Sequence, residues 1–164
     1  MNDIILKFFG AAVLLAASFF LGASMIRDER GKIDEACSIL DLIKYIKDNI
    51  EHFVKPLPDI FASYNNSVLE KNGFLTSVRE NGIHLTAEKI EDYFHTDSEL
   101  LSIFGDFCRS IGGGYKDDEV RLCSYTANQI EKRIEKMRDD YSSRSKLYRT
   151  IPPLFALSVV LILV

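Results

Sequence analysis

Two long apolar stretches without a charged residue, one at each end of the chain, constrain its fold more than any other feature. The first runs from Phe8 to Ile26 and has 19 residues, and the second runs from Ile151 to Val164 and has 14. As helices they would be about 28 Å and about 21 Å long, and the hydrocarbon core of a bilayer is roughly 30 Å thick. We therefore expect transmembrane helices within residues 1–26 and 151–164.

Each end also has a second interpretation. The first stretch fits a cleaved signal peptide, with Lys7 before it and small residues at 22–24 for processing. Its length exceeds the usual signal core of roughly 7 to 15 residues and Arg27 follows at once, which favours an uncleaved anchor. The second stretch fits a buried core helix, but a small domain offers little interior to surround it. Pro152 and Pro153 would occupy its first turn, where proline is tolerated.

The segment between the ends, residues 27–150, differs from them in composition. The whole chain carries 20 basic and 24 acidic residues, of which only Lys7 and Asp3 lie outside this segment. Its acidic balance excludes a basic nucleic-acid module, since no excess of cations is available to release phosphate counterions. Apolar residues recur regularly along it, which predicts one folded domain and not a disordered linker.

Basic residues flank the two predicted membrane segments on the side of this middle domain. They are Arg27, Arg30, Lys32, Arg144, Lys146 and Arg149. Because cytoplasmic flanks are enriched in lysine and arginine, we expect the domain to face the cytoplasm.

The three cysteines, Cys37, Cys108 and Cys123, are odd in number and contain no CxxC pair. This usage predicts reduced thiols packed as small apolar side chains. It also disfavours the disulfide framework of a secreted domain.

Apolar periodicity predicts an all-α helical bundle for the middle domain, because no stretch alternates as a strand would. An amphipathic helix is expected over 33–54. Its apolar stripe comprises Ile33, Cys37, Leu40, Ile43, Ile46, Ile50 and Phe53. The sequence Pro56-Leu57-Pro58 then imposes a bend, and Pro58 suits the first turn of a short helix at 59–64. Asparagine and glycine residues divide 67–79 into short helices.

Cap signals predict the next helices. Thr86 is a candidate N-cap for a helix that reaches Phe94. Thr96 with Glu99 fits a capping box, which opens a helix with one apolar face. That face comprises Leu100, Leu101, Phe104, Phe107, Cys108 and Ile111. Gly112 is expected to stop that helix.

The longest periodic pattern comes last, on a helix that starts near Asp117 or Asp118 and runs toward Tyr148. Either aspartate suits the N-cap position. We expect its apolar seam to pack within the domain, although a dimeric coiled coil has the same pattern. The seam comprises Val120, Cys123, Ala127, Ile130, Ile134, Met137 and Tyr141.

Sequence patterns for catalysis or metal binding are missing. His52, His84 and His95 are far apart and form no HxxxH pair, so they are expected at the surface or half-buried. The triple glycine at 112–114 is followed by no Gly-Lys-Ser/Thr and leaves a helix instead of a strand, which indicates a linker and not a phosphate loop. The acids at 117–119 suit a helix start, with a divalent cation as the alternative. We expect no enzymatic activity, no cofactor and no metal.

Two sequence blocks carry a resemblance to a known family. They are IEHFVKPLPDIF at 50–61, and the block from FGDFCRSIGG through NQIEKRIEKM to KLYRTIPPLF at 104–155. With an apolar segment at each end, the chain resembles the stage III sporulation protein AB family over essentially its whole length. The glycines at 112–114 and the prolines at 152–153 depart from the pattern expected of that family.

The resemblance implies a soluble part similar to the helical domains of inner-membrane platform proteins in type II secretion and type IV pilus systems. It also implies a component of the channel complex that endospore-forming bacteria assemble between mother cell and forespore, needed for forespore development. The domain would then face the mother-cell cytoplasm. Its implied partners are membrane lipid and other stage III channel proteins, including the secretion-type ATPase, stage III sporulation protein AA.

We therefore expect a non-enzymatic membrane platform. Two other functions remain open: a platform or assembly protein of a pilus or secretion system outside sporulation, and a secreted helical binding domain released by signal cleavage. The candidate residues for structure or interaction are Pro56, Leu57, Pro58, Gly112, Asp117, Lys146, Tyr148 and Arg149.

Overall fold

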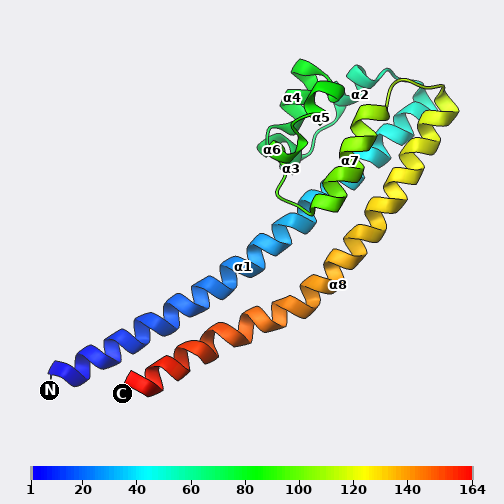
Figure 1. Ribbon diagram of the computed structural model, residues 1–164. Coiled ribbons are helices and arrows are strands. Elements are labelled where there is room, and N and C mark those ends of the chain that lie inside the picture. The colour runs from blue at the N-terminus through cyan, green and yellow to red at the C-terminus, as the bar shows by residue number, and fades with distance from the viewer. Residues whose placement is uncertain (1, 164) are drawn as a thin grey trace. The chain divides into compact units, whose positions relative to one another are not determined.

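The computed structural model is helical along the chain (Figure 1). It describes the backbone of residues 2–163 and the side chains of residues 10, 12–13, 16–147, 150–151, 154–155 and 158. No strand occurs between residues 2 and 163, so the predicted all-α class is confirmed. The chain divides into two compact units. One joins Met1–Arg30 to Arg138–Val164, and the other, Gly31–Met137, is called the helical domain below.

Two of the helices are far longer than the rest. These are α1 (Asn2–Asp48) and α8 (Lys116–Leu163). Between them lie a π-helix, η1 (Asn49–Phe53), and the α-helices α2 (Leu57–Ser63), α3 (Ser67–Lys71), α4 (Phe74–Asn81), α5 (Ile83–Ala87), α6 (Ile90–Tyr93) and α7 (Ser98–Ser110).

Both long helices continue past the positions where composition changes. No helix break separates residues 26 and 27 in α1, or residues 150 and 151 in α8. The prediction that Pro152 and Pro153 open a separate helix is wrong, because α8 continues to Leu163. Proline removes a backbone donor and bends a helix without always ending it.

The two predicted membrane segments fall in the unit formed by the chain ends. Within the described part of the chain, no helix combines the length and apolar character needed to cross a membrane. Many side chains of the two segments lie outside the described residues, as do those of Tyr148 and Arg149. In α1, Gly22 is buried whereas Leu21 and Ala23 are exposed. A helical glycine allows a neighbouring backbone to approach closely.

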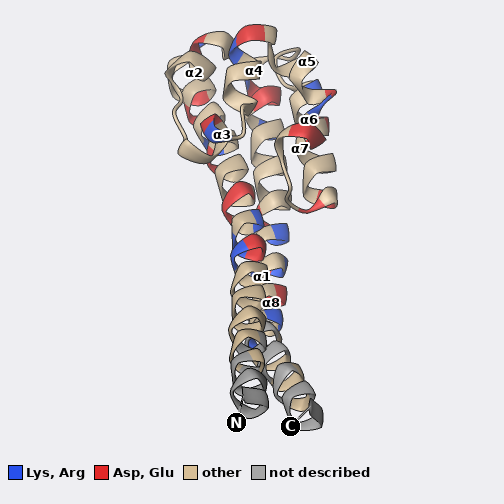
Figure 2. Ribbon diagram, turned by 90° about the vertical axis from the view of Figure 1, so that its left-hand side faces the viewer, with Lys and Arg blue, Asp and Glu red and all other residues tan. Residues whose placement is uncertain are grey.

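The core of the helical domain forms from the apolar stripes that periodicity predicts. The apolar face of α7 is buried at every predicted position: Leu100, Leu101, Phe104, Phe107, Cys108 and Ile111. Along α8, Cys123, Ile130 and Ile134 belong to the same hydrophobic cluster. Their burial within the chain supports packing inside the domain. Figure 2 shows acidic and basic residues interspersed along the helices of this domain.

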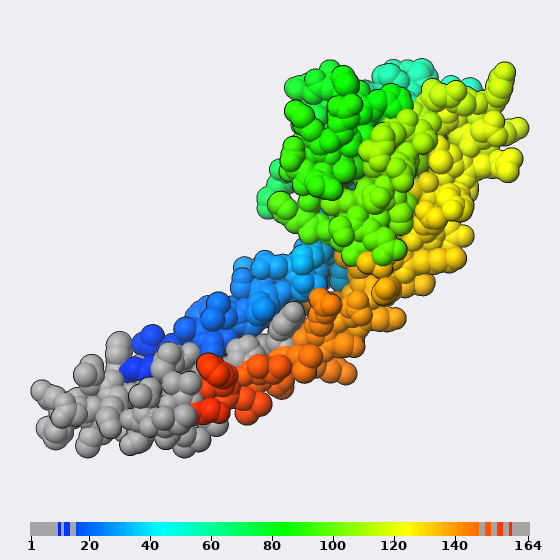
Figure 3. All heavy atoms as spheres, in the orientation of Figure 1, coloured from blue at the N-terminus to red at the C-terminus, as the bar shows by residue number. Residues whose placement is uncertain are grey.

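Four phenylalanines form an aromatic cluster at the centre of this core. Phe74 lies with its ring centroid 5.2 Å from that of Phe94 and 5.5 Å from that of Phe104. The Phe104 ring stacks on Phe107 at 6.3 Å. All four side chains are fully buried. The side chains of α4 to α7, green in Figure 3, cover this side of the domain as one continuous mass.

The stripe predicted for the first amphipathic helix is buried from Leu40 to Ile50 but not at its end. Phe53 is 67% exposed, so its predicted place on the buried face is wrong. The cause is the π-helix Asn49–Phe53, whose wider i→i+5 turns rotate the following side chains away from the α-helical stripe.

Thr86 lies inside α5 and does not cap a helix, so that prediction is also wrong. Its hydroxyl donates a hydrogen bond to the Gly82 carbonyl oxygen at 2.9 Å, four residues back. Threonine satisfies its hydroxyl in this way inside helices, and so its presence alone does not mark a helix start.

The N-cap of α7 is Asp97 and not Thr96, which corrects the predicted capping box. The Asp97 carboxylate accepts a hydrogen bond from the Leu100 N–H at 3.0 Å, and the Arg133 guanidinium donates to both its oxygens at 2.7 Å. Arg133 also lies 2.7 Å from Glu99. The hydrogen bonds from Arg133 are the main cause that holds the pKa of Asp97 below its usual value. The Thr96 hydroxyl instead donates to a carbonyl oxygen of α1 at 2.8 Å.

Candidate functional site

The chain reverses direction at the Pro-Leu-Pro sequence, after an irregular end to the first long helix. Val54 follows the π-helix with φ +50° and ψ +38°, a left-handed conformation. Pro56 is then the N-cap of α2, with Pro58 in its first turn. Val54 is the one non-glycine residue with positive φ in the described chain. This conformation is a true outlier for a β-branched side chain, so the bend holds backbone strain.

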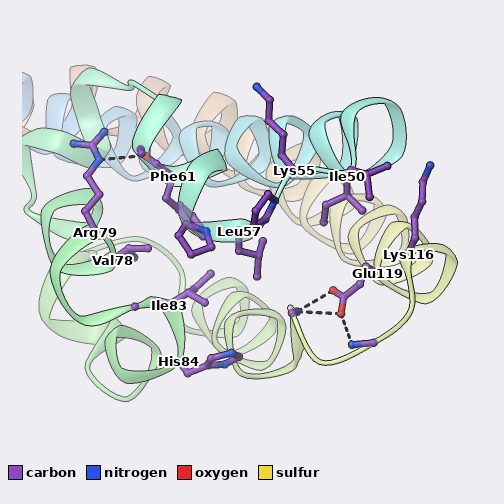
Figure 4. Close-up of a pocket in the computed structure, with 17 residues that line it drawn as sticks. Ile50, Lys55, Leu57, Phe61, Val78, Arg79, Ile83, His84, Lys116 and Glu119 are labelled. Atoms are coloured by element: carbon purple, nitrogen blue, oxygen red, sulfur yellow. Dashed lines mark hydrogen bonds between the residues drawn. The ribbon is translucent and has the colours of Figure 1, made fainter.

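The glycine loop after α7 is held by a buried carboxylate. Both Glu119 oxygens lie 3.0 Å from the Gly112 N–H, and Oε1 lies 2.7 Å from the Gly114 N–H, as Figure 4 shows. Glu119 is only 7% exposed. Consecutive N–H groups of a loop form an anion-binding concavity. Here the anion comes from the first turn of α8.

These contacts give the glycine loop an additional role and correct one prediction. The loop is a carboxylate cradle as well as a linker, a role that periodicity gave no reason to expect. The helix α8 begins at Lys116, so Asp117 is an exposed residue of its first turn and not its N-cap. The signal available in the sequence was a short glycine run followed within one turn by acids, but nothing local selects Glu119 from Asp117 and Asp118.

The glycine loop and the Pro-Leu-Pro bend, 55 positions apart, meet in the fold. A Cβ atom on Gly112 would lie 2.7 Å from Leu57 Cδ1 and 3.9 Å from His84 Nε2. Gly112 also has φ +93°, which favours glycine. The backbone conformation therefore favours a glycine where the two segments touch, and a larger residue there would also displace the Leu57 side chain.

A pocket of about 740 Å³ opens beside this contact, and we call it the bend pocket. Its lining residues come from three stretches: 50–62, 78–84 and 112–119. In Figure 4 the side chains of Leu57 and Ile83 point toward each other across it. The volume is typical of ligand and peptide sites, which are mostly apolar with a few polar groups.

The charged residues of the bend pocket differ in how they are engaged. Arg79 is occupied, since it lies 2.9 Å from Glu70 and donates to the Tyr64 carbonyl oxygen at 2.6 Å. Lys55 and Lys116 are exposed, and neither forms an ion pair in the described part of the chain. The Lys55 ammonium lies 5.4 Å from the Phe53 ring centroid. The rim of the pocket therefore presents two available cations.

The structure brings together four of the candidate residues named from the sequence. Pro56, Leu57, Pro58 and Gly112 all line the bend pocket. Asp117 lies beside the glycine loop but does not line the pocket. Lys146, Tyr148 and Arg149 belong to the unit formed by the chain ends, and the last two side chains lie outside the described residues.

The cysteines are packing residues, as predicted. Cys108 and Cys123 are buried free thiols, and Cys37 is half-buried. Burial raises the pKa of Cys108 and raises that of Cys123 to about 12. Thiols in this state are inert, because the thiolate is the nucleophile and the metal ligand.

One group of side chains near the bend has ligand atoms close enough for a cation. Asp48, Glu51 and His52 offer atoms within 4.8 Å of one another, and all three are exposed. Lys47 already lies 3.9 Å from Glu51. Such surface clusters are common without an ion, and we assign none here. The other two histidines, His84 and His95, are also exposed, in agreement with the sequence.

Comparison with known proteins gave one match. A family model described as stage III sporulation protein AB matches residues 7–164, a range that includes the helical domain and both apolar stretches, 8–26 and 151–164. No curated protein and no solved structure matches the chain significantly.

Proposed function

The chain belongs to the stage III sporulation protein AB family, and from this premise we propose that it is a non-catalytic platform protein of a sporulation membrane complex. Family membership connects the chain with stage III of sporulation. The finer role, a membrane-anchored component of the channel between mother cell and forespore, is our proposal. The observation that carries it is the family match across both apolar ends and the helical domain together.

Membrane anchoring is supported by the sequence of the ends. Residues 8–26 and 151–164 carry no charge, and basic residues stand on the domain side of each. We propose that the two ends anchor the chain in one membrane and that the helical domain faces the mother-cell cytoplasm. The buried Gly22 is a suitable contact point between membrane helices.

A binding role is supported by the way polar groups are used in the bend pocket. Glu119 and Arg79 are committed to backbone groups of the domain. The remaining lining is mostly apolar, with lysines at the rim. Such a surface suits recognition of another protein. We propose that the partners are other stage III channel proteins, including the secretion-type ATPase, stage III sporulation protein AA.

Deletion of the chain in its spore-forming host tests the platform role. We expect engulfment to finish and late forespore gene expression to fail, with rescue by the full-length chain. Late forespore expression is read with a fluorescent reporter and spore yield by heat-resistant counts. A deletion strain with normal spore yield would contradict the proposal.

Membrane orientation is tested with a cysteine at an exposed position. Tyr115 is 85% exposed at the start of α8. The variant Tyr115→Cys should react with a membrane-impermeant maleimide only after the cells are permeabilised. The unmodified chain is the control, since two of its three thiols are buried. Labelling in intact cells would contradict the proposed orientation.

A further inference from the structure

We propose that the bend pocket is the docking site for a segment of a partner protein in which apolar side chains are flanked by carboxylates. This inference deepens the proposed function and rests on it, because it specifies which surface of the platform binds and what chemistry it selects.

Hydrophobic side chains are exposed at the bend pocket. Val54 lines the pocket and is 67% exposed, and Leu57 lines it while half-buried. Phe53, outside the lining, is also 67% exposed. Apolar surface thus continues beyond the cavity itself. This extent suits a peptide segment that crosses the rim better than a small molecule enclosed by the pocket.

The net charge of the residues that line the pocket is opposite in sign to that of the helical domain. Within residues 31–137 the sequence has 13 Lys and Arg against 19 Asp and Glu, a net charge of −6. The charged residues lining the pocket are Lys55, Arg79, Lys116 and Glu119, an excess of two cations. Since Glu119 and Arg79 are occupied, the lysines determine what the rim attracts. Electrostatic complementarity of this kind selects partners and speeds encounter.

Backbone strain at the same place is an independent observation. The left-handed Val54 and the π-helix before it both cost stability. Strained conformations persist where the surrounding structure holds them, and they cluster at functional sites. In this domain the strain coincides with the exposed apolar wall of the pocket.

The partner segment would place an apolar side chain between Leu57 and Ile83. Its flanking carboxylates would meet Lys55 on one side and Lys116 on the other, where Figure 4 shows both lysines directed away from the cavity floor. Ion pairs at an exposed rim are individually weak, because solvent screens them. Reversal of both lysines should therefore weaken docking by roughly tenfold.

Photo-crosslinking of the full-length chain in sporulating cells is the test. His84 is exposed and lines the pocket, so a photoreactive benzoylphenylalanine is placed there. Tyr125 is 65% exposed on α8 outside the lining and receives the same group as the control position. We expect one product from His84 only, whose crosslinked peptide carries apolar residues beside Asp or Glu.

The contribution of the two rim lysines is tested in the same strain. Lys55→Glu with Lys116→Glu should lower the yield of that product about tenfold. The matched variant Lys71→Glu with Lys132→Glu, at exposed positions outside the pocket, should leave it unchanged. Unchanged urea unfolding of both purified variants shows that folding is not the cause.

Several outcomes would overturn the inference. The first two are the absence of a product from His84 and the same product from Tyr125. The next two are a crosslink to lipid or to a second copy of this chain, and a crosslinked peptide that is basic. The last is a crosslinking yield that does not change when Lys55 and Lys116 are reversed. Failure of the platform role is separate, because it appears as normal sporulation in the deletion strain.

Discussion

The aromatic cluster and the bend pocket are made from similar apolar residues, yet one is closed and the other open. Phe74 and Phe104 are 0% exposed, whereas Val54 and Phe53 are both 67% exposed. The rings of the cluster find one another across α4, α7 and the segment after α6. At the bend, the two prolines and the glycine loop instead line an open pocket. On the proposed function, the cluster supplies stability and the pocket supplies recognition.

Loss of one ring from the cluster should have the largest effect on stability. Phe104→Ala leaves a cavity where three other rings packed and should lower the free energy of unfolding by about 3 to 5 kcal/mol. The control, Leu85→Ala, removes a side chain that is 62% exposed and should change it by less than about 0.5 kcal/mol. Urea titration of the detergent-solubilised chain, followed by tyrosine fluorescence, measures both. Equal effects would remove the contrast between the two regions.

A methyl group at the contact between bend and glycine loop should come next. Gly112→Ala places a Cβ 2.7 Å from Leu57 at φ +93°, and we expect a loss of about 1 to 3 kcal/mol. Gly113→Ala is the matched control, because nothing lies within 4 Å of its Cβ. The same urea titration compares them. If the two variants were equally stable, the pocket would not depend on this close approach.

The carboxylate cradle should contribute slightly less. Glu119→Gln keeps the shape of the side chain but weakens the charge-assisted bonds to Gly112 and Gly114, at a cost of about 1 to 2 kcal/mol. Asp118→Asn, at an exposed neighbouring position, should be nearly neutral. Amide hydrogen exchange at the two glycines should accelerate in the first variant only. Unchanged exchange there would show that the loop holds itself in place.

The ion pair at the start of α7 should make the free energy of unfolding depend on pH in the acidic range. The pKa of Asp97 is lowered in the folded state by Arg133, so its stabilisation is present above the usual aspartate pKa near 4 and is lost as pH falls through the lower folded value. The contribution is about 1 kcal/mol. Asp97→Asn should flatten the profile of unfolding free energy between roughly pH 5 and pH 2. A profile identical to that of the unmodified chain would exclude this role.

Relief of strain at the bend should have the smallest effect and the opposite sign. Val54→Gly accepts φ +50° without strain and should stabilise the chain by up to about 1 kcal/mol. The matched change Val68→Gly, inside α3, should destabilise by about 0.5 to 1 kcal/mol. If Val54 is retained for docking, its glycine variant should also give less crosslinked product from His84. If the variant were more stable and still crosslinked fully, the strain at Val54 would have no role in docking.

The helices and their buried faces could be predicted from residue spacing alone, because apolar spacing is a local property. The stripe on α7 and the seam on α8 are buried largely where periodicity places them, and Pro56 marks the end of the first amphipathic helix. Helix starts were predicted less well. Thr96 and Asp117 have suitable chemistry for caps, but Asp97 and the start at Lys116 depend on neighbours that are distant in sequence.

The contacts between these elements depend on the folded chain and could not be predicted from local patterns. In the sequence, Leu57 belongs to a predicted bend and Gly112 to a predicted helix end. Their contact arises because the core brings α2 beside the loop after α7. The choice of Glu119 as the cradle's carboxylate also depends on the direction of α8. Periodicity reports which face of a helix avoids water. It carries no information on which distant segment that face will contact. The bend pocket forms where two such segments, the Pro-Leu-Pro bend and the glycine loop, come into contact.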